Sequence, residues 1–212
     1  MKNLAKLTIL FLSLNLITAN AQVLEKTVHR LEFQDSYAKP YEYLKNKYDF
    51  TIAFYVEGGW NIGNVTTIEV LALKNKTWKK IILQVPDDRS NPSTKPKIKI
   101  ASFESKKALK LMDDLTAIDF WSIQNDSLNI REIKPKIQSE DFLNKDSVVI
   151  VAHRIRRFQV VDASTYYFAI TRNDGLKIYT CQAPDLYLKT FPEIKTTATF
   201  IKAKELFERA VE

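Results

Sequence analysis

Apolar and polar residues alternate over several short segments of the chain, and this alternation is typical of half-buried β-strands. Residues 50–56, FTIAFYV, follow this pattern. Residues 65–73 and 77–85 follow it on either side of the polar turn Lys74-Asn75-Lys76. Strands joined by so short a turn are antiparallel. We therefore expect one strand followed by an antiparallel pair.

Residues 164–182, STYYFAITRNDGLKIYTCQ, predict a hairpin around Asn173-Asp174-Gly175. A two-residue Asp-Gly loop would set Arg172 opposite Lys177, which like-charge repulsion disfavours. We expect a three-residue loop instead, with Gly175 left-handed and Cys181 opposite Tyr167. That register puts five apolar side chains on one face: Tyr166, Phe168, Ile170, Leu176 and Ile178.

Three other segments carry apolar residues at helical spacing: residues 37–48, 108–118 and 203–211. The middle helix has Ser102 or Ser105 as its candidate N-cap. Phe120 and Trp121 follow this helix directly. We expect them to close it onto the sheet.

The order of these elements predicts an α+β fold. We expect an antiparallel sheet of about five to seven strands with two or three packed helices, including a C-terminal helix. The segment 86–97 contains three prolines and no large apolar residue, so it is predicted to be an exposed loop or a subdomain hinge. Residues 22–212 are long enough for a single α+β domain, which is the organisation we expect.

Residues 1–21 have the features of a secretory signal peptide. Lys2 and Lys6 precede an apolar run, and Ala19-Asn20-Ala21 forms a small-residue cleavage site before Gln22. The apolar run is too short to span a bilayer. The sequence therefore predicts a bacterial protein in the periplasm or the medium, with no integral membrane segment after processing.

Composition limits the chemistry that this chain can carry. The formal net charge of +7 falls to +5 when Lys2 and Lys6 are removed, and this mild excess permits but does not require an anionic partner. Export and the lack of a nucleic-acid-binding motif argue against nucleic acid as the partner. With one cysteine and two histidines, the chain has no internal disulfide and no Cys-rich or His-rich metal site. We expect no cofactor.

Residues 147–162, SVVIVAHRIRRFQVVD, predict a long strand that is buried at one end and charged on both faces from His153 onward. Its second half is either a solvated strand end or an anion site. Arg154 and Arg156 lie side by side on one face, where two guanidinium groups could grip a phosphate, sulfate or carboxylate. In the glycine-containing segment EGGWNIGN, the indole of Trp60 could stack on a sugar or a peptide.

No sequence motif of a known catalytic site occurs in the chain. A nucleophilic pair of Cys181 and His153 is conceivable, but a buried, inert thiol is the favoured interpretation. Asp113 and Asp114 are helix neighbours that point about 100° apart, so they are expected on the solvated face. Asp87-Asp88 lacks the acid spacing of a calcium loop.

The C-terminal third, DASTYYFAITRNDGLKIYTCQAPD followed by a helix, and the preceding segment ALKLMDDLTAIDFWSI resemble small exported bacterial proteins of uncharacterised families. These proteins place a helix ending in a Phe-Trp pair before a hairpin of this shape. The resemblance covers about half of the chain. It implies no activity and no catalytic residues.

The sequence thus predicts an exported soluble domain that is non-enzymatic and binds a protein, a peptide or a glycan fragment. The candidate ligand-binding residues are His153, Arg154, Arg156 and Trp60. An exported hydrolase, with an acid and base assembled only in three dimensions, is the alternative. A toxin-neutralising or assembly partner is a third hypothesis, which predicts a large exposed apolar or charged patch.

Overall fold

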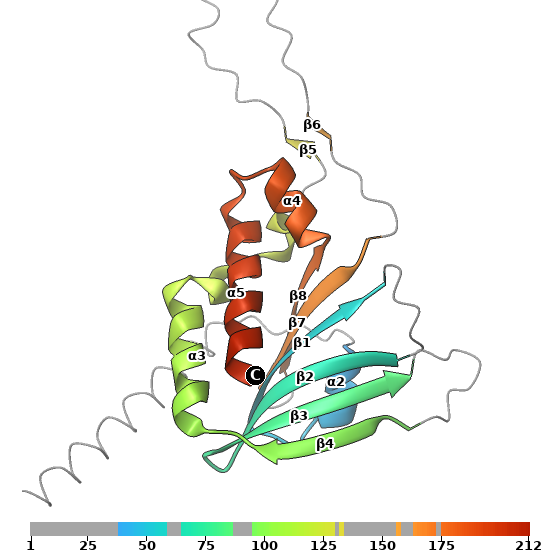
Figure 1. The fold of residues 1–212 in the computed structure, drawn as a ribbon, viewed down its shortest axis with the longest axis vertical. Helices are drawn as coiled ribbons and strands as arrows, with labels where there is room; N and C mark the ends of the chain where they lie inside the picture. The colour runs from blue at the N-terminus through green and yellow to red at the C-terminus, as the bar shows by residue number, and fades with distance from the viewer. Residues whose placement is uncertain are drawn as a thin grey trace, which may run out of the picture.

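A six-stranded antiparallel sheet with helices on its faces forms most of the described part of the molecule (Figure 1). The computed structural model describes residues 38–58, 65–86, 95–129, 132–133, 156–157, 163–172 and 175–212. The strand order is β4-β3-β2-β1-β7-β8. The strands are β1 (Phe50–Glu57), β2 (Val65–Lys74), β3 (Thr77–Pro86), β4 (Lys97–Ser102), β7 (Thr165–Arg172) and β8 (Gly175–Gln182).

The helices cover the two faces of the sheet unequally. The longer helices α3 and α5 lie side by side on one face, whereas the short α2 lies against the other (Figure 1). No helix within the described ranges is both long and apolar enough to cross a membrane. The helices are α2 (Lys39–Leu44), α3 (Ser105–Ala117), α4 (Pro184–Thr190) and α5 (Lys195–Val211), with short 3₁₀ turns η1 (Phe120–Ser122) and η2 (Asn125–Ser127). The α+β prediction is confirmed, including the C-terminal helix.

The first three strands lie where the alternating pattern predicts them. The turn between β2 and β3 is one residue shorter than expected, because Lys74 pairs with Thr77. Asn75 and Lys76 both have positive φ angles, 48° and 63°. Two successive left-handed residues suit the right-handed twist of the flanking strands. The Asn75 N–H donates to Asp49 Oδ2 at 2.8 Å, which fixes the turn against the start of β1.

The register predicted for the C-terminal hairpin is wrong. Arg172 pairs with Gly175, which leaves only residues 173–174 between the strands, and these two lie outside the described residues. Cys181 is opposite Tyr166 rather than Tyr167. This register turns Tyr179 toward the helices and Leu176 and Ile178 toward the other face. Both faces of the hairpin are apolar, so the side-chain pattern did not determine which face each residue occupies.

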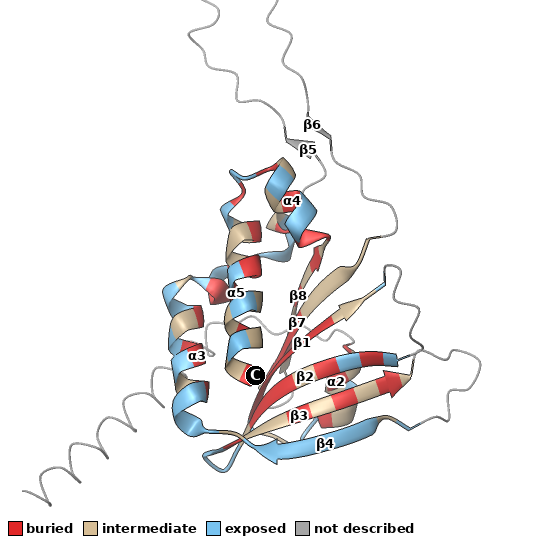
Figure 2. Cartoon of the chain, in the orientation of Figure 1, coloured by how far each residue is buried: buried red, intermediate tan, exposed pale blue. Residues whose placement is uncertain are grey.

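Strand β4 is an element that the apolar pattern does not predict, and it begins where the expected loop at 86–97 ends. Residues 87–94 of that segment lie outside the described residues. β4 pairs with β3 at the edge of the sheet, and every residue of it is exposed (Figure 2). The strand is only six residues long and alternates lysine with isoleucine, so it carries too few apolar residues to stand out beside β1 to β3.

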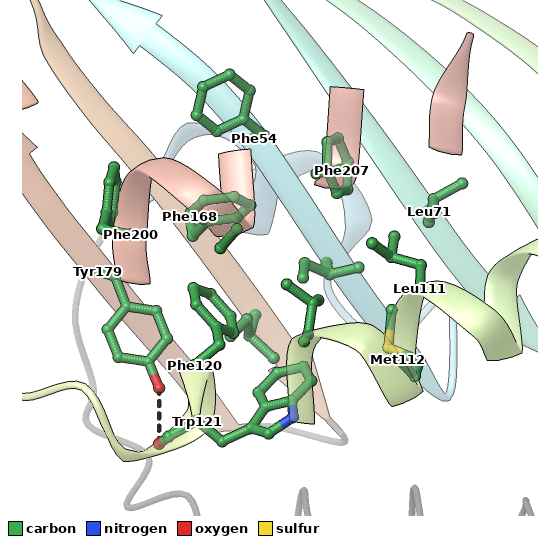
Figure 3. Close-up of a cluster of buried hydrophobic side chains, with 14 of the residues drawn as sticks. Phe54, Leu71, Leu111, Met112, Phe120, Trp121, Phe168, Tyr179, Phe200 and Phe207 are labelled. Atoms are coloured by element: carbon green, nitrogen blue, oxygen red, sulfur yellow. Dashed lines mark hydrogen bonds between the residues drawn. The ribbon is translucent and has the colours of Figure 1, made fainter. Parts of the chain in front are cut away.

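Aromatic rings fill the core between the sheet and helices α3 and α5 (Figure 3). Phe168 lies at its centre and is fully buried. Its ring centroid is 5.0 Å from those of Phe54 and Phe120, 5.4 Å from that of Phe200 and 5.9 Å from that of Phe207. The rings meet edge-on or tilted, which is the favoured geometry for aromatic pairs.

The opposite face of the sheet has a second core with smaller side chains and a tyrosine pair. The rings of Tyr55 and Tyr167 stack 4.7 Å apart. Thr51 and Thr171, on the neighbouring strands β1 and β7, are buried with their hydroxyl oxygens 2.6 Å apart. Because each hydroxyl can donate or accept, this pair satisfies two buried polar groups at once.

The predicted helical stripes are confirmed for α3 and α5, and the predicted cap of α3 is wrong. The N-cap is Glu104, not Ser102 or Ser105, and its side chain makes no capping hydrogen bond. Phe120 and Trp121 are buried as expected, and Trp121 Nε1 donates to Thr116 Oγ1 at 2.9 Å. The first helix, α2, is shorter than predicted because it ends at Leu44; residue 37, the first of its expected stripe, lies outside the described residues.

Candidate functional site

The structure describes little of the predicted ligand-binding set. Trp60, His153 and Arg154 lie outside the described residues. Arg156 belongs to β6 (Arg156–Arg157), whose backbone pairs with β5 (Glu132–Ile133) in a separate two-stranded sheet. The long strand predicted over residues 147–162 is thus described only at Arg156–Arg157, where it pairs outside the main sheet. Its other residues lie outside the described ranges. The side chains of all four residues thus lie outside the described part of the structure.

Cys181 is buried, as the sequence analysis expected. Its side chain is fully enclosed on β8, and Sγ lies 3.6 Å from the carbonyl oxygen of Leu128. Burial, and secondarily the charge of Asp185, raise the pKa of the thiol to about 12. A nucleophilic cysteine needs a lowered pKa and access to substrate, so this thiol has neither property.

The charge of one carboxylate, on β2, affects the pKa of another on α5. Burial raises the pKa of Glu208 on α5, Lys204 lowers it, and the charge of Glu69 on β2 raises it. Glu69 also forms an ion pair with Lys80, with Nζ and Oε1 3.3 Å apart, and Lys80 donates to the carbonyl oxygen of Val211. Lys80 thus compensates the charge of Glu69 and fastens β3 to the end of α5.

The other carboxylates within the described ranges offer less chemistry. Asp114 pairs with Lys110 at 2.7 Å on the exposed side of α3, and Asp113 is exposed, as the sequence analysis expected. In the part of the chain that the structure describes, no three acidic, histidine or cysteine side chains lie close enough together to hold a metal ion.

The two edges of the main sheet differ in how their backbone groups are satisfied. At β8, the side-chain amides of Asn125 and Asn129 take the place of a neighbouring strand. Asn125 donates to the carbonyl oxygen of Ile178 at 2.6 Å and accepts from the N–H of Thr180 at 3.0 Å. Asn129 donates to the carbonyl oxygen of Thr180 at 2.8 Å and accepts from the N–H of Gln182 at 3.0 Å. The β8 edge is therefore occupied from Ile178 to Gln182.

At the opposite edge, no strand among the described residues pairs with the outer side of β4. Ile98 and Ile100 of this strand are 44% and 55% exposed, although large apolar side chains are mostly buried elsewhere in the described fold. They lie opposite Leu83 and Ile81, which are fully buried, so the apolar face of the sheet extends to its edge. Edge strands of this kind present unpaired N–H and C=O groups that can pair with another chain.

The edge of β4 (Lys97–Ser102) is thus the described surface best suited to recognition, because it offers backbone hydrogen bonds and apolar contacts together. Sequence reasoning missed it, although the alternation in KIKI after a proline-rich segment was a usable signal for an edge strand. Among the other described groups, Cys181 is buried, and Glu69 and Asp114 each form an ion pair with a lysine. A comparison of this chain with known protein families finds no match, and a comparison with curated proteins finds none either.

Proposed function

We propose that this protein is an exported, non-enzymatic binding domain that accepts an extended segment of a protein partner along the outer edge of β4. The observation that carries the proposal is the contrast between the two sheet edges. Asn125 and Asn129 bind the β8 edge, whereas no described strand pairs with the outer edge of β4, which exposes Ile98 and Ile100. Addition of a strand to an accessible sheet edge is a common mode of peptide recognition.

The thiol chemistry also supports a binding role over nucleophilic catalysis. Cys181, the only cysteine of the chain, is enclosed and has a raised pKa. We also propose export to the periplasm or the medium, because residues 1–21 have the features of a signal peptide. The C-terminal segments are the basis for proposing kinship with uncharacterised exported bacterial families. Recovery from the periplasm or the medium of a chain whose intact mass matches residues 22–212 would support export.

The edge assignment can be tested with the processed protein and a pooled library of eight-residue peptides. We expect bound peptides to slow hydrogen exchange at alternate backbone amides of β4, because those amides point away from β3. The double substitution Ile98→Lys and Ile100→Lys removes the apolar contacts and should abolish this protection. Leu186→Lys is the matched control, because Leu186 is an equally exposed apolar residue, 49% exposed, on α4.

Two results would contradict this assignment. One is a library that yields no protection at β4. The other is a double variant that binds the same peptides as strongly as the unmodified protein and the Leu186→Lys control.

The alternative function, an exported hydrolase, is favoured by one observation. The pKa of Glu208 is raised, first by burial and then by the charges of Glu69, Glu205 and Glu212, and a carboxyl group with a raised pKa can act as a general acid. Turnover of a peptide, ester or glycoside substrate that is lost in Glu208→Gln would favour the hydrolase. The ion pair between Lys80 and Glu69 argues against it, because the second carboxylate is already bound.

A further inference from the structure

The exposed strand β4 carries two rows of side chains with different chemistry. Lys97 and Lys99 point to the face that bears α3 and α5, as their pairing with Gln84 and Ile82 requires. Ile98 and Ile100 point to the opposite face, beside Leu83 and Ile81. A segment added to this edge meets both rows at once, because directly opposite residues in an antiparallel pair share a face.

The lysine row has no compensating charge within the described residues. Neither Lys97 nor Lys99 forms an ion pair there, whereas Lys80, on the neighbouring strand, is already bound to Glu69. Both lysines are exposed, and the chain carries a formal net charge of +7. Opposite charges directly across a strand pair are stabilising, and like charges are destabilising.

A second copy of the chain is poorly suited to this edge. Of the two-fold antiparallel registers that pair five residues of β4, one sets Lys99 opposite Lys99 of the other copy. The other register avoids that contact but sets Ile98 opposite Ser102, so that only one directly opposed isoleucine pair, Ile100 with Ile100, remains where the first register has two. Lysines on an edge strand are a common means of preventing such self-association.

We infer that the segment accepted by β4 alternates acidic with apolar residues, so that its carboxylates lie opposite Lys97 and Lys99 and its apolar side chains cover Ile98 and Ile100. This inference rests on the proposed function, and it names the chemistry of the partner. The segment needs about six extended residues to match the length of β4.

The test compares two labelled ten-residue peptides by fluorescence anisotropy with the processed protein. One alternates glutamate with valine, and the other alternates lysine with valine. We expect the glutamate peptide to bind about tenfold more tightly, since two cross-strand pairs change from repulsive to attractive. The preference should shrink as the salt concentration rises, because exposed charges are screened.

Charge reversal at the edge provides the decisive variant. Lys97→Glu with Lys99→Glu should transfer the preference to the lysine peptide. Lys106→Glu with Lys107→Glu, on the exposed start of α3, changes the net charge equally and should leave the preference for glutamate intact. If the charge-reversed variant does not fold, the neutral variant Lys97→Gln with Lys99→Gln takes its place. The neutral variant should bind both peptides equally.

The outcomes separate this inference from the proposed function. Equal binding of both peptides at β4 would overturn the inference and leave strand addition standing. Absence of binding by either peptide, together with a library that leaves the β4 amides unprotected, would overturn both. Another outcome in sedimentation is a dimer of the unmodified protein that the double substitution Ile98→Lys and Ile100→Lys dissociates. That result would overturn the inference, because the occupant of β4 would then be a second copy of the chain.

Discussion

Tyr179 shows how single residues of the core combine apolar burial with a satisfied polar group. Its ring packs against that of Phe120 with centroids 4.9 Å apart, and its hydroxyl donates to the carbonyl oxygen of Trp121 at 3.0 Å (Figure 3). Burial raises the pKa of this hydroxyl. The bond also connects β8 to η1, so the residue links the sheet with the segment that follows α3.

Cys181 should be unreactive in the folded protein. With its pKa raised to about 12 by burial, almost none of the thiol is ionised at pH 8, and alkylation requires the thiolate. We expect iodoacetamide to label Cys181 only after unfolding in urea, as measured by intact mass. Lys106→Cys, at an exposed position of α3, should label within minutes as a control. Rapid labelling of the unmodified native protein would contradict the described burial.

The same thiol gives stability a dependence on pH. The folded pKa lies above the ordinary value of 9.0, so the unfolded chain releases this proton first. The contribution of Cys181 to the free energy of unfolding therefore falls as the pH rises from about 9 toward 12.

At this scale the sequence predicted burial better than it predicted binding. Trp121 and Cys181 are buried as expected, since apolar side chains that follow a helical stripe or lie within a strand are mostly buried. Ile98 and Ile100 are exposed instead. Their surroundings depend on which strand lies at the edge, and strand order is a property of the whole sheet that no local pattern contains.

Among the elements, η2 and the residues directly after it are attached to β8 by two asparagine side chains. Asn125 and Asn129 each supply a donor and an acceptor, as one residue of an added strand would. Their spacing of four residues lets them reach alternate positions of β8. The edge is thus protected without a further strand.

Replacement of both asparagines with alanine should weaken the fold and open the β8 edge. Each lost hydrogen bond contributes about 0.5–1.5 kcal/mol, and the freed backbone groups can pair with another chain. We expect a lower midpoint in urea denaturation and concentration-dependent self-association in sedimentation. Gln124→Ala, beside the same turn, should do neither. A double variant that is monomeric and equally stable would contradict the role assigned to the two amides.

The elements also show where pattern reasoning fails. β1 to β3, α3 and α5 were predictable because each repeats its apolar period over eight or more residues. The hairpin of β7 and β8 was not, because both of its faces are covered and a shift of one residue still buries apolar side chains. The buried Tyr179 and its bond to Trp121 decide the register, and that partner lies 58 residues away in the sequence.

For the whole molecule we expect one cooperative unfolding transition. β3 and β4 pair across the proline-rich segment 86–97, and β1 pairs with β7 from the last third of the chain. The strands before and after the segment 86–97 thus belong to one sheet, so neither group of strands can stay paired when the other unfolds. Tryptophan fluorescence and far-ultraviolet circular dichroism should give coincident curves in urea. Two separate transitions would indicate that the segment 86–97 is a hinge between independent subdomains.

The contact of Thr51 with Thr171 joins residues that are 120 positions apart in the chain. During synthesis, the inner strand β1 thus keeps one side unpaired until most of the polypeptide has been made, and closing so large a loop slows folding. The order of strands in the sheet thereby delays completion of the fold until β7 has left the ribosome, because β1 cannot pair on both sides before then.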